Sequence, residues 1–304
     1  MYLLTLVLGL GLLLWGMKEL RQGLQSFAGL YLRQLLLWMT ATPIRGFWAG
    51  GICTAFLQSS TALTVMAVSF VDAELLPFEN ALALILGSNI GSTLTTQLLA
   101  LPLEQITPYL LALGALGYLF IPKRIRYLFL AVFGLSLLFF ALSMLQSGMA
   151  PLADKPSIQQ FLQQLGNNHL KGVLAGTLLS ALLHSSSATT GIVMLLTENG
   201  QITLPTALAF IFGANIGTCF TAVLAALVSS RAAQRVAVFH VLLNVFGVLL
   251  FLPFVGPMAQ GLSLIGGSLS RQVANAHTLF NILSSLLAFP LLPKATQFLK
   301  RILH

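Results

Sequence analysis

Long apolar runs, separated by short polar or basic breaks, dominate this chain. Seven runs are candidates for membrane-spanning helices, because a helix rises about 1.5 Å per residue and must cross roughly 30 Å of hydrocarbon. They cover residues 2–17, 82–101, 108–121, 127–145, 207–228, 236–255 and 273–292. No positive charge or cleavage site before Lys18 marks the first run as a signal peptide, so we interpret it as a retained helix. Residues 19–39 alternate basic and apolar positions and are expected along the membrane interface.

Two other apolar segments are too short to cross. Residues 46–57 and 172–183 span about 18 Å each as helices. Each runs into a polar cluster and then resumes as a second apolar arm; the clusters are Gln58-Ser59-Ser60-Thr61 and His184-Ser185-Ser186-Ser187. We expect two re-entrant helical hairpins, which persist at membrane depth when buried in protein or lining a wet cavity. The alternative is one long helix per segment, with serines bonded to preceding carbonyls.

The chain also repeats itself. Without a gap, residues 45–101 align with residues 171–227 at an offset of 126, and 21 of the 57 pairs are identical. The serine clusters fall on each other, and so do two Gly-x-Asn-Ile-Gly runs that begin at Gly87 and Gly213. Three predicted crossings lie between the copies, and this odd number inverts the second copy. Inverted repeats with interrupted helices are typical of secondary transporters, whose site lies where the repeats meet.

The predicted fold is therefore an all-α polytopic membrane protein with two inverted-topology repeats. Each repeat has a re-entrant hairpin and a transmembrane helix broken at the glycines Gly87 and Gly91, or Gly213 and Gly217. The expected parts are a helix with an interfacial helix (1–44), repeat 1 (45–147), an external linker (148–170), repeat 2 (171–292) and a cytoplasmic tail (293–304). We expect the glycines of the short arms to serve close helix packing.

Composition excludes a soluble globule. Charged residues make up 7% of the chain and hydrophobic residues 57%, and the mean hydropathy is +0.91, whereas soluble domains carry about 25% charged residues. The net charge of +8 does not indicate a nucleic-acid binder, because the bases flank apolar runs. Twelve lie on one predicted side: Lys18, Arg21, Arg33, Arg45, Lys123, Arg124, Arg126, Arg231, Arg235, Lys294, Lys300 and Arg301. Only Lys155, Lys171 and Arg271 lie on the other.

This imbalance makes the basic side cytoplasmic. We expect a multi-pass protein of the cell (inner or plasma) membrane, with the N-terminus outside and the C-terminus in the cytoplasm.

The polar clusters suit an anion together with a cation. Helix N-termini after the breaks present free N–H groups and positive dipole ends, and serine and threonine hydroxyls add donors. The expected anion ligands are Gln58, Ser59, Ser60, Thr61, His184, Ser185, Ser186 and Ser187. Amide and hydroxyl oxygens suit Na⁺; the expected cation ligands are Gln58, Thr64, Asn89, Thr190, Asn215 and Thr218. Since neither cluster contains Lys or Arg, a bound anion needs dipoles, hydroxyls and co-bound cations to balance its charge.

Other polar residues point to structure. Serines beside His184 could indicate a nucleophile and its base, but the hairpin acids Asp72 and Glu198 lie at the far ends of the arms, so we expect no enzyme activity. His184 itself is interpreted either as a hydrogen-bonded structural residue or as a substrate contact. Two His-x-x-x-Asn pairs, which begin at His240 and His277, are interpreted as hydrogen bonds between helices, with a role in the site as the alternative.

These motifs resemble the type II sodium–phosphate cotransporter family in its shorter bacterial form. The resemblance rests on the Gln-Ser-Ser and His-Ser-Ser clusters, the two Gly-x-Asn-Ile-Gly runs and Ala-Asn-Ala-His-Thr-Leu-Phe-Asn at 274–281. It implies Na⁺-coupled movement of inorganic phosphate by alternating access at a midplane site between the hairpin tips. The family pattern is Gln-Ser-Ser-Ser in both repeats, so Thr61 and His184 are departures; the second could alter cation choice or pH dependence.

The resemblance implies no cofactor other than Na⁺ as coupling ion, and it leaves room for a homodimer and for a cytoplasmic regulatory domain or protein. Two alternatives stay open. One is a carrier for another oxyanion or a dicarboxylate, coupled to protons through His184. The other is a membrane subunit that binds phosphate without transporting it.

Overall fold

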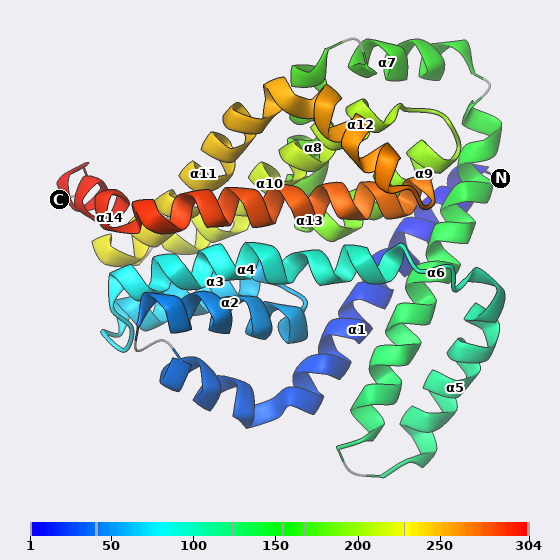
Figure 1. Ribbon diagram of the computed structural model, residues 1–304. Coiled ribbons are helices and arrows are strands. Elements are labelled where there is room, and N and C mark those ends of the chain that lie inside the picture. The colour runs from blue at the N-terminus through cyan, green and yellow to red at the C-terminus, as the bar shows by residue number, and fades with distance from the viewer. Residues whose placement is uncertain are drawn as a thin grey trace.

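The computed structural model describes residues 2–39, 42–122, 124–153, 155–166, 168–227 and 229–302, and Lys123 of the charge count therefore lies outside the described residues. Within these ranges every regular element is helical (Figure 1). Six of the described helical stretches are long and apolar enough to cross a membrane: Tyr2–Ala28, Phe78–Leu99, Arg126–Pro151, Leu204–Ala226, Arg231–Ile265 and Leu269–Ile302. The expectation of an all-α polytopic membrane protein is confirmed. The seventh expected span, 108–121, forms α5 (Thr107–Phe120), which has only 14 residues.

Both hairpins are present, and they are built alike. In the first, α2 (Pro43–Leu57) and α3 (Ser60–Asp72) are separated by two residues, and the same holds for α8 (His169–Leu183) and α9 (Ser186–Glu198). Each hairpin is followed by a long helix, α4 (Phe78–Leu99) or α10 (Leu204–Ala226). Corresponding helices begin 126 residues apart, so the duplication seen in the sequence is also a duplication of structure. The alternative of one continuous helix through each serine cluster is wrong.

The expected break in the long helices is also wrong. Helix α4 runs without interruption through Gly87 and Gly91, and α10 runs through Gly213 and Gly217. These glycines permit close packing instead. A Cβ on Gly87 would lie 1.8 Å from the carbonyl oxygen of Phe47 in α2, and one on Gly213 would lie 1.9 Å from that of Val173 in α8.

The short arms contribute glycines to the same contacts. A Cβ on Gly50 of α2 or on Gly176 of α8 would lie 2.0 Å from a carbonyl oxygen of the adjacent long helix. The packing role expected for the arm glycines is confirmed at these two positions. Backbone lies against backbone in each pair, which fixes the hairpin arm on its long helix.

Three of the expected segments contain helices whose bounds the structure gives. Helix α1 (Tyr2–Met39) continues past residue 17 as a single helix. The linker 148–170 contains the end of α6 (Arg126–Ala153) and the whole of α7 (Pro156–Gly166). Helix α14 (Leu292–Ile302) occupies most of the segment 293–304.

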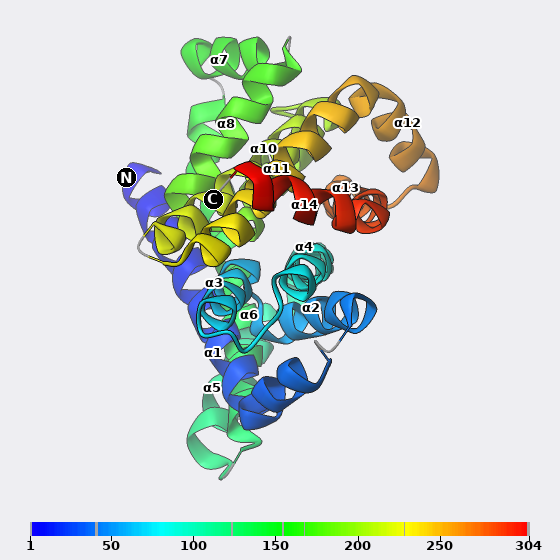
Figure 2. The same ribbon diagram turned by 90° about the vertical axis from the view of Figure 1, so that its left-hand side faces the viewer.

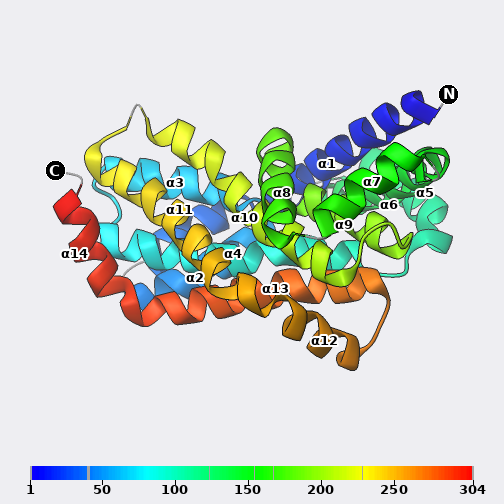
Figure 3. The same ribbon diagram turned by 90° about the horizontal axis from the view of Figure 1, so that it is seen from above.

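The remaining helices surround the two hairpin units. Helices α1 and α6 pack along each other through glycines, and α5 folds back beside α6 at one end of the molecule (Figures 1 and 3). Helices α11 (Arg231–Phe251), α12 (Val255–Ile265) and α13 (Leu269–Ala288) follow α10, and Figure 2 shows α12 at the edge of the molecule away from α1.

Helix α4 is tied to α13 and α11 by polar contacts. Nδ1 of His277 in α13 lies 3.2 Å from the hydroxyl oxygen of Thr96. Nε2 of His240 in α11 lies 3.2 Å from Oδ1 of Asn89. Arg271 donates to Oε1 of Gln97 at 2.7 Å. The interpretation of the two His-x-x-x-Asn pairs as links between helices is confirmed for their histidines.

Gly213→Ala tests whether this glycine serves packing. We expect the added methyl to clash with the backbone of α8 and to lower stability by about 1–3 kcal/mol, the usual cost of overpacking. The measurement is thermal unfolding in detergent. The control is Gly261→Ala in α12, where no atom lies within 4 Å of the added Cβ. Equal unfolding temperatures for the two variants would contradict the packing role.

Candidate functional site: a polar cavity between the hairpin tips

The turn of each hairpin has the same local structure. Gln58 and His184 end the first arms in the left-handed conformation, with φ of 53° and 51°. Ser59 and Ser185 then cap the second arms, because their hydroxyl oxygens accept hydrogen bonds from the N–H groups of Ala62 and Ala188. A left-handed residue followed by a serine N-cap reverses the chain within two residues.

Gln58 and His184 also make equivalent contacts. Oε1 of Gln58 accepts a hydrogen bond from the hydroxyl of Thr95 in α4. Nδ1 of His184 lies 2.9 Å from the hydroxyl of Thr221 in α10, the position equivalent to Thr95. His184 therefore replaces Gln58 in a contact that ties the hairpin tip to its long helix, which supports the structural interpretation of this residue.

The two tips meet at one small cavity. Its volume is about 20 Å³, and its lining residues are Arg21, Gln58, Ser59, Ser60, Thr61, Ser92, His184, Ser185, Ser186, Ser187 and Thr218. All eight expected anion ligands are among them. Ser92 was not expected, although it is the counterpart of Thr218 in the repeat and the alignment could have found it.

Many hydrogen-bond donors at this cavity are free. The hydroxyls of Ser60, Thr61, Ser186 and Ser187 form no hydrogen bond with any described residue. The N–H groups of the same four residues, which open α3 and α9, also have no partner in the described part of the chain. Two helix N-termini with free donors thus point at one place, an arrangement suited to an anion.

Arg21 changes the expected charge balance of the site, which counted only helix dipoles, hydroxyls and co-bound cations. It belongs to α1, outside the aligned repeats, and was counted among the orientation charges of the cytoplasmic side. The structure places it inside the candidate span Tyr2–Ala28 and in the lining of the cavity. Its Nη2 donates to the carbonyl oxygen of Gln58 at 3.5 Å. In the sequence Arg21 is one of three charges, with Lys18 and Glu19, near the end of an apolar helix, and charges at membrane depth indicate candidate functional positions.

The expected cation ligands are only partly brought together. Gln58 and Thr218 line the cavity, and the other four lie outside its lining. The oxygen of Asn89 faces His240, and the hydroxyl of Thr190 donates to the carbonyl of Ser186 at 2.8 Å.

Asn215 donates to the carbonyl of Ile211 at 2.8 Å, and the buried hydroxyl of Thr64 has no partner among the described residues. The four glycines expected at helix breaks pack the hairpin arms instead.

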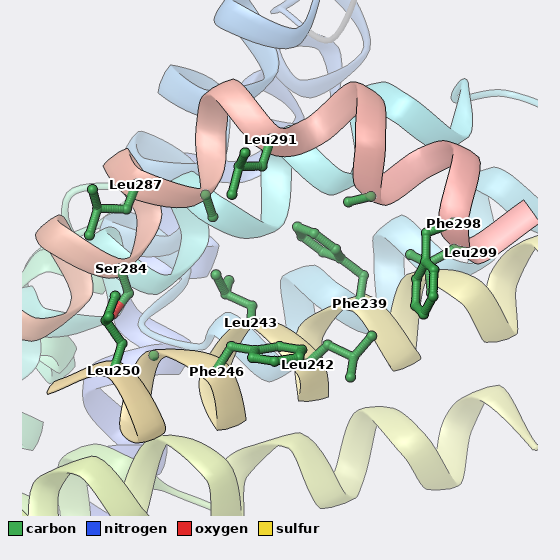
Figure 4. Close-up of a pocket in the computed structure, with 13 residues that line it drawn as sticks. Phe239, Leu242, Leu243, Phe246, Leu250, Ser284, Leu287, Leu291, Phe298 and Leu299 are labelled. Carbon is green, nitrogen blue, oxygen red and sulfur yellow. The ribbon is translucent and has the colours of Figure 1, made fainter. Parts of the chain in front are cut away.

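Larger cavities elsewhere have a different chemistry. One of about 260 Å³ between α11, α13 and α14 is lined by Phe239, Phe246, Leu250, Leu287 and other apolar side chains, with Ser284 as the one hydroxyl (Figure 4). Another, of about 780 Å³, lies beside Glu198 and Arg271 and includes neither tip. The small cavity is the one that unites the duplicated clusters.

The fold and the single polar cavity between its two duplicated tips define a multi-pass helical membrane protein of the transporter type. A sequence model of the Na⁺/Pi-cotransporter family matches the chain twice, over residues 12–147 and 142–270. The chain therefore belongs to this family. The double match agrees with the internal duplication.

Relatives support the same assignment. "Uncharacterized protein YqeW" of Bacillus subtilis is 37% identical over 240 residues, which cover 79% of this chain and 78% of YqeW. "Putative inorganic phosphate export protein YjbB" of Salmonella typhimurium is 31% identical over 259 residues, 85% of this chain and 48% of YjbB. This chain thus spans about half the length of YjbB.

A more distant match is local. "Sodium-dependent phosphate transport protein 2A" of Oryctolagus cuniculus is 39% identical over 61 residues, 20% of this chain and 10% of that protein. No solved structure matches.

Ser60→Ala and Ser186→Ala test the free hydroxyls. Each change deletes one donor, and a hydrogen bond to a charged group contributes about 1.5–3 kcal/mol, so we expect a ten- to hundred-fold loss of affinity. The measurement is a titration with inorganic phosphate in detergent. Ser69→Ala, near the far end of α3, should bind like the unmodified protein. Unchanged affinity in both tip variants would remove the hydroxyls from the site.

Proposed function

We propose that this protein is a secondary active transporter that couples the movement of inorganic phosphate to Na⁺. The observation that carries the proposal is the single cavity between both hairpin tips, with two helix N-termini and free hydroxyls around it. Phosphate offers up to four oxygens as acceptors, which matches donors that come from two directions. The family and the printed name of YjbB favour phosphate over other anions.

The size of the cavity supports alternating access. A volume of about 20 Å³ holds about one water molecule and is too small for phosphate. We infer that the tips separate when substrate enters. Two hairpins related by a repeat provide two such movements, and inverted topology would place one on each side of the membrane.

Gln58 and Thr218, which line the cavity, are the proposed first ligands of Na⁺, and the proposal involves no cofactor beyond this ion. Thr64, Asn89, Thr190 and Asn215 would join them only after rearrangement. The proposed setting is the cell membrane, with the N-terminus outside and the C-terminus in the cytoplasm, as the distribution of basic residues indicates.

Transport is tested with purified protein in liposomes. We expect accumulation of radiolabelled phosphate when a Na⁺ gradient is imposed, and little accumulation when choline replaces Na⁺. Sulfate, arsenate and succinate are added as unlabelled competitors. If one of them inhibits uptake of labelled phosphate more strongly than unlabelled phosphate does, the protein is a carrier for that anion. Phosphate binding without counterflow would identify a non-transporting subunit and contradict the proposal.

His184→Gln tests proton coupling. A glutamine cannot take up a proton, so a comparison of the two proteins isolates whatever His184 contributes to the pH dependence of binding. Proton coupling through His184 would appear as a rise in phosphate affinity between about pH 8 and about pH 6 that the glutamine variant lacks. Glutamine is the matched replacement because Gln58 makes the equivalent threonine contact.

The comparison is made at a fixed concentration of one ionic form of phosphate, since phosphate itself titrates in this range. The same corrected pH profile in both proteins would leave His184 a structural residue and would contradict proton coupling through it.

A further inference from the structure

One face of α1 contacts both hairpin tips. Met17, Arg21 and Gln25 follow one another at intervals of four residues and therefore lie on one side of the helix. The hydroxyl of Ser185 at the second tip lies 3.8 Å from the sulfur of Met17. At the first tip, Arg21 contacts the carbonyl oxygen of Gln58, and Nε2 of Gln25 donates to that of Leu57 at 3.3 Å.

The charge of Arg21 lacks a protein partner. It forms no ion pair with any residue that the structure describes, since the one salt bridge found there joins Lys300 to Glu79. Its Nε is buried and has no hydrogen-bond partner in the described ranges. An uncompensated charge inside a membrane helix is costly and marks a functional position.

The local structure also offers a simpler role for Arg21. A helix leaves its last carbonyl oxygens without partners, and basic side chains commonly satisfy them. Arg21 does so for the end of α2, but only through one contact at 3.5 Å, at the limit of a hydrogen bond. Gln25 makes the adjacent contact without a charge. Capping therefore explains one donor of Arg21 and leaves its charge and Nε unexplained.

We propose that Arg21 is the fixed counter-charge of the anion site. Its guanidinium would face an oxyanion held between the free hydroxyls and N–H groups of the two tips, and this inference rests on the function proposed above. An arginine binds phosphate oxygens with a planar set of donors. The bound anion then draws less on co-bound Na⁺ for charge balance, and its doubly charged form gains more from Arg21 than its singly charged form.

The test compares Arg21→Gln, Arg21→Lys and Gln25→Ala in the purified full chain. Glutamine keeps a donor for the carbonyl of Gln58 and removes the charge, whereas lysine keeps the charge. Gln25→Ala removes the neighbouring capping bond without changing a residue of the cavity lining. The probes are inorganic phosphate and sulfate, each titrated at low and high Na⁺, with phosphate also titrated at two pH values that favour its singly or its doubly charged form. Thermal unfolding reports the fold.

We expect Arg21→Gln to bind phosphate about ten- to hundred-fold more weakly and to lose its preference for the doubly charged form. Arg21→Lys should retain most of the affinity, and Gln25→Ala should bind phosphate normally while unfolding at a lower temperature. Unmodified affinity and ionic preference in a folded Arg21→Gln protein would overturn the inference and leave phosphate transport standing.

The two proposals fail separately in other outcomes. If the unmodified protein binds sulfate in preference to phosphate and Arg21→Gln loses that binding, the counter-charge stands and the phosphate assignment fails. If the unmodified protein binds neither anion, both fail. If Arg21→Gln does not fold, Arg21→Lys decides the question. A folded lysine variant that loses as much phosphate affinity as expected for glutamine contradicts a role for the charge.

Discussion

Four helix ends meet at the cavity, and each end leaves backbone N–H or C=O groups without an intrahelical partner. The need to satisfy these groups determines the chemistry of the site. In hydrocarbon each backbone group without a partner costs several kcal/mol. The protein satisfies some of them itself, since Ser59 and Ser185 cap the second arms and α1 supplies donors to the end of α2. The N–H groups of Ser60 and Ser186 and their neighbours remain. They require water or an anion as acceptor, and these N–H groups are the donors of the proposed anion site.

Such a site works only if the tips are held in place, and glycines provide this. Gly50 and Gly87 bring α2 and α4 into backbone contact, and Gly176 and Gly213 do the same for α8 and α10. Each hairpin arm is thereby fixed to a long helix rather than to the opposite tip. The long helix α4 is in turn tied to α13 and α11 by His277 and His240. A tip can thus move only together with the long helix that its arm packs against, or by breaking that packing contact.

The sequence predicted the duplicated hairpins well because their signals are local and occur twice. Short apolar arms and serine caps specify the turn of the first hairpin, and the offset of 126 residues locates the equivalent turn in the second repeat. The glycine runs at Gly87 and Gly213 were misread, because glycine both interrupts helices and permits close packing, and only the neighbouring backbone distinguishes the two. Arg21 could not be placed from the sequence, since nothing local shows that α1 crosses the tips.

The two repeats have nearly the same structure, but α1 contacts their tips through different residues. Arg21 holds the first tip through Gln58, while Met17 lies against Ser185 of the second. One tip therefore meets a charge and the other a thioether, although their turns are nearly identical. If the tips separate in alternation, moving the first away from α1 breaks the contacts with Arg21 and Gln25, and moving the second breaks the contact with the sulfur of Met17. Because the proposed anion would face the guanidinium of Arg21, its binding would change the contact at the first tip more directly than the contact at the second.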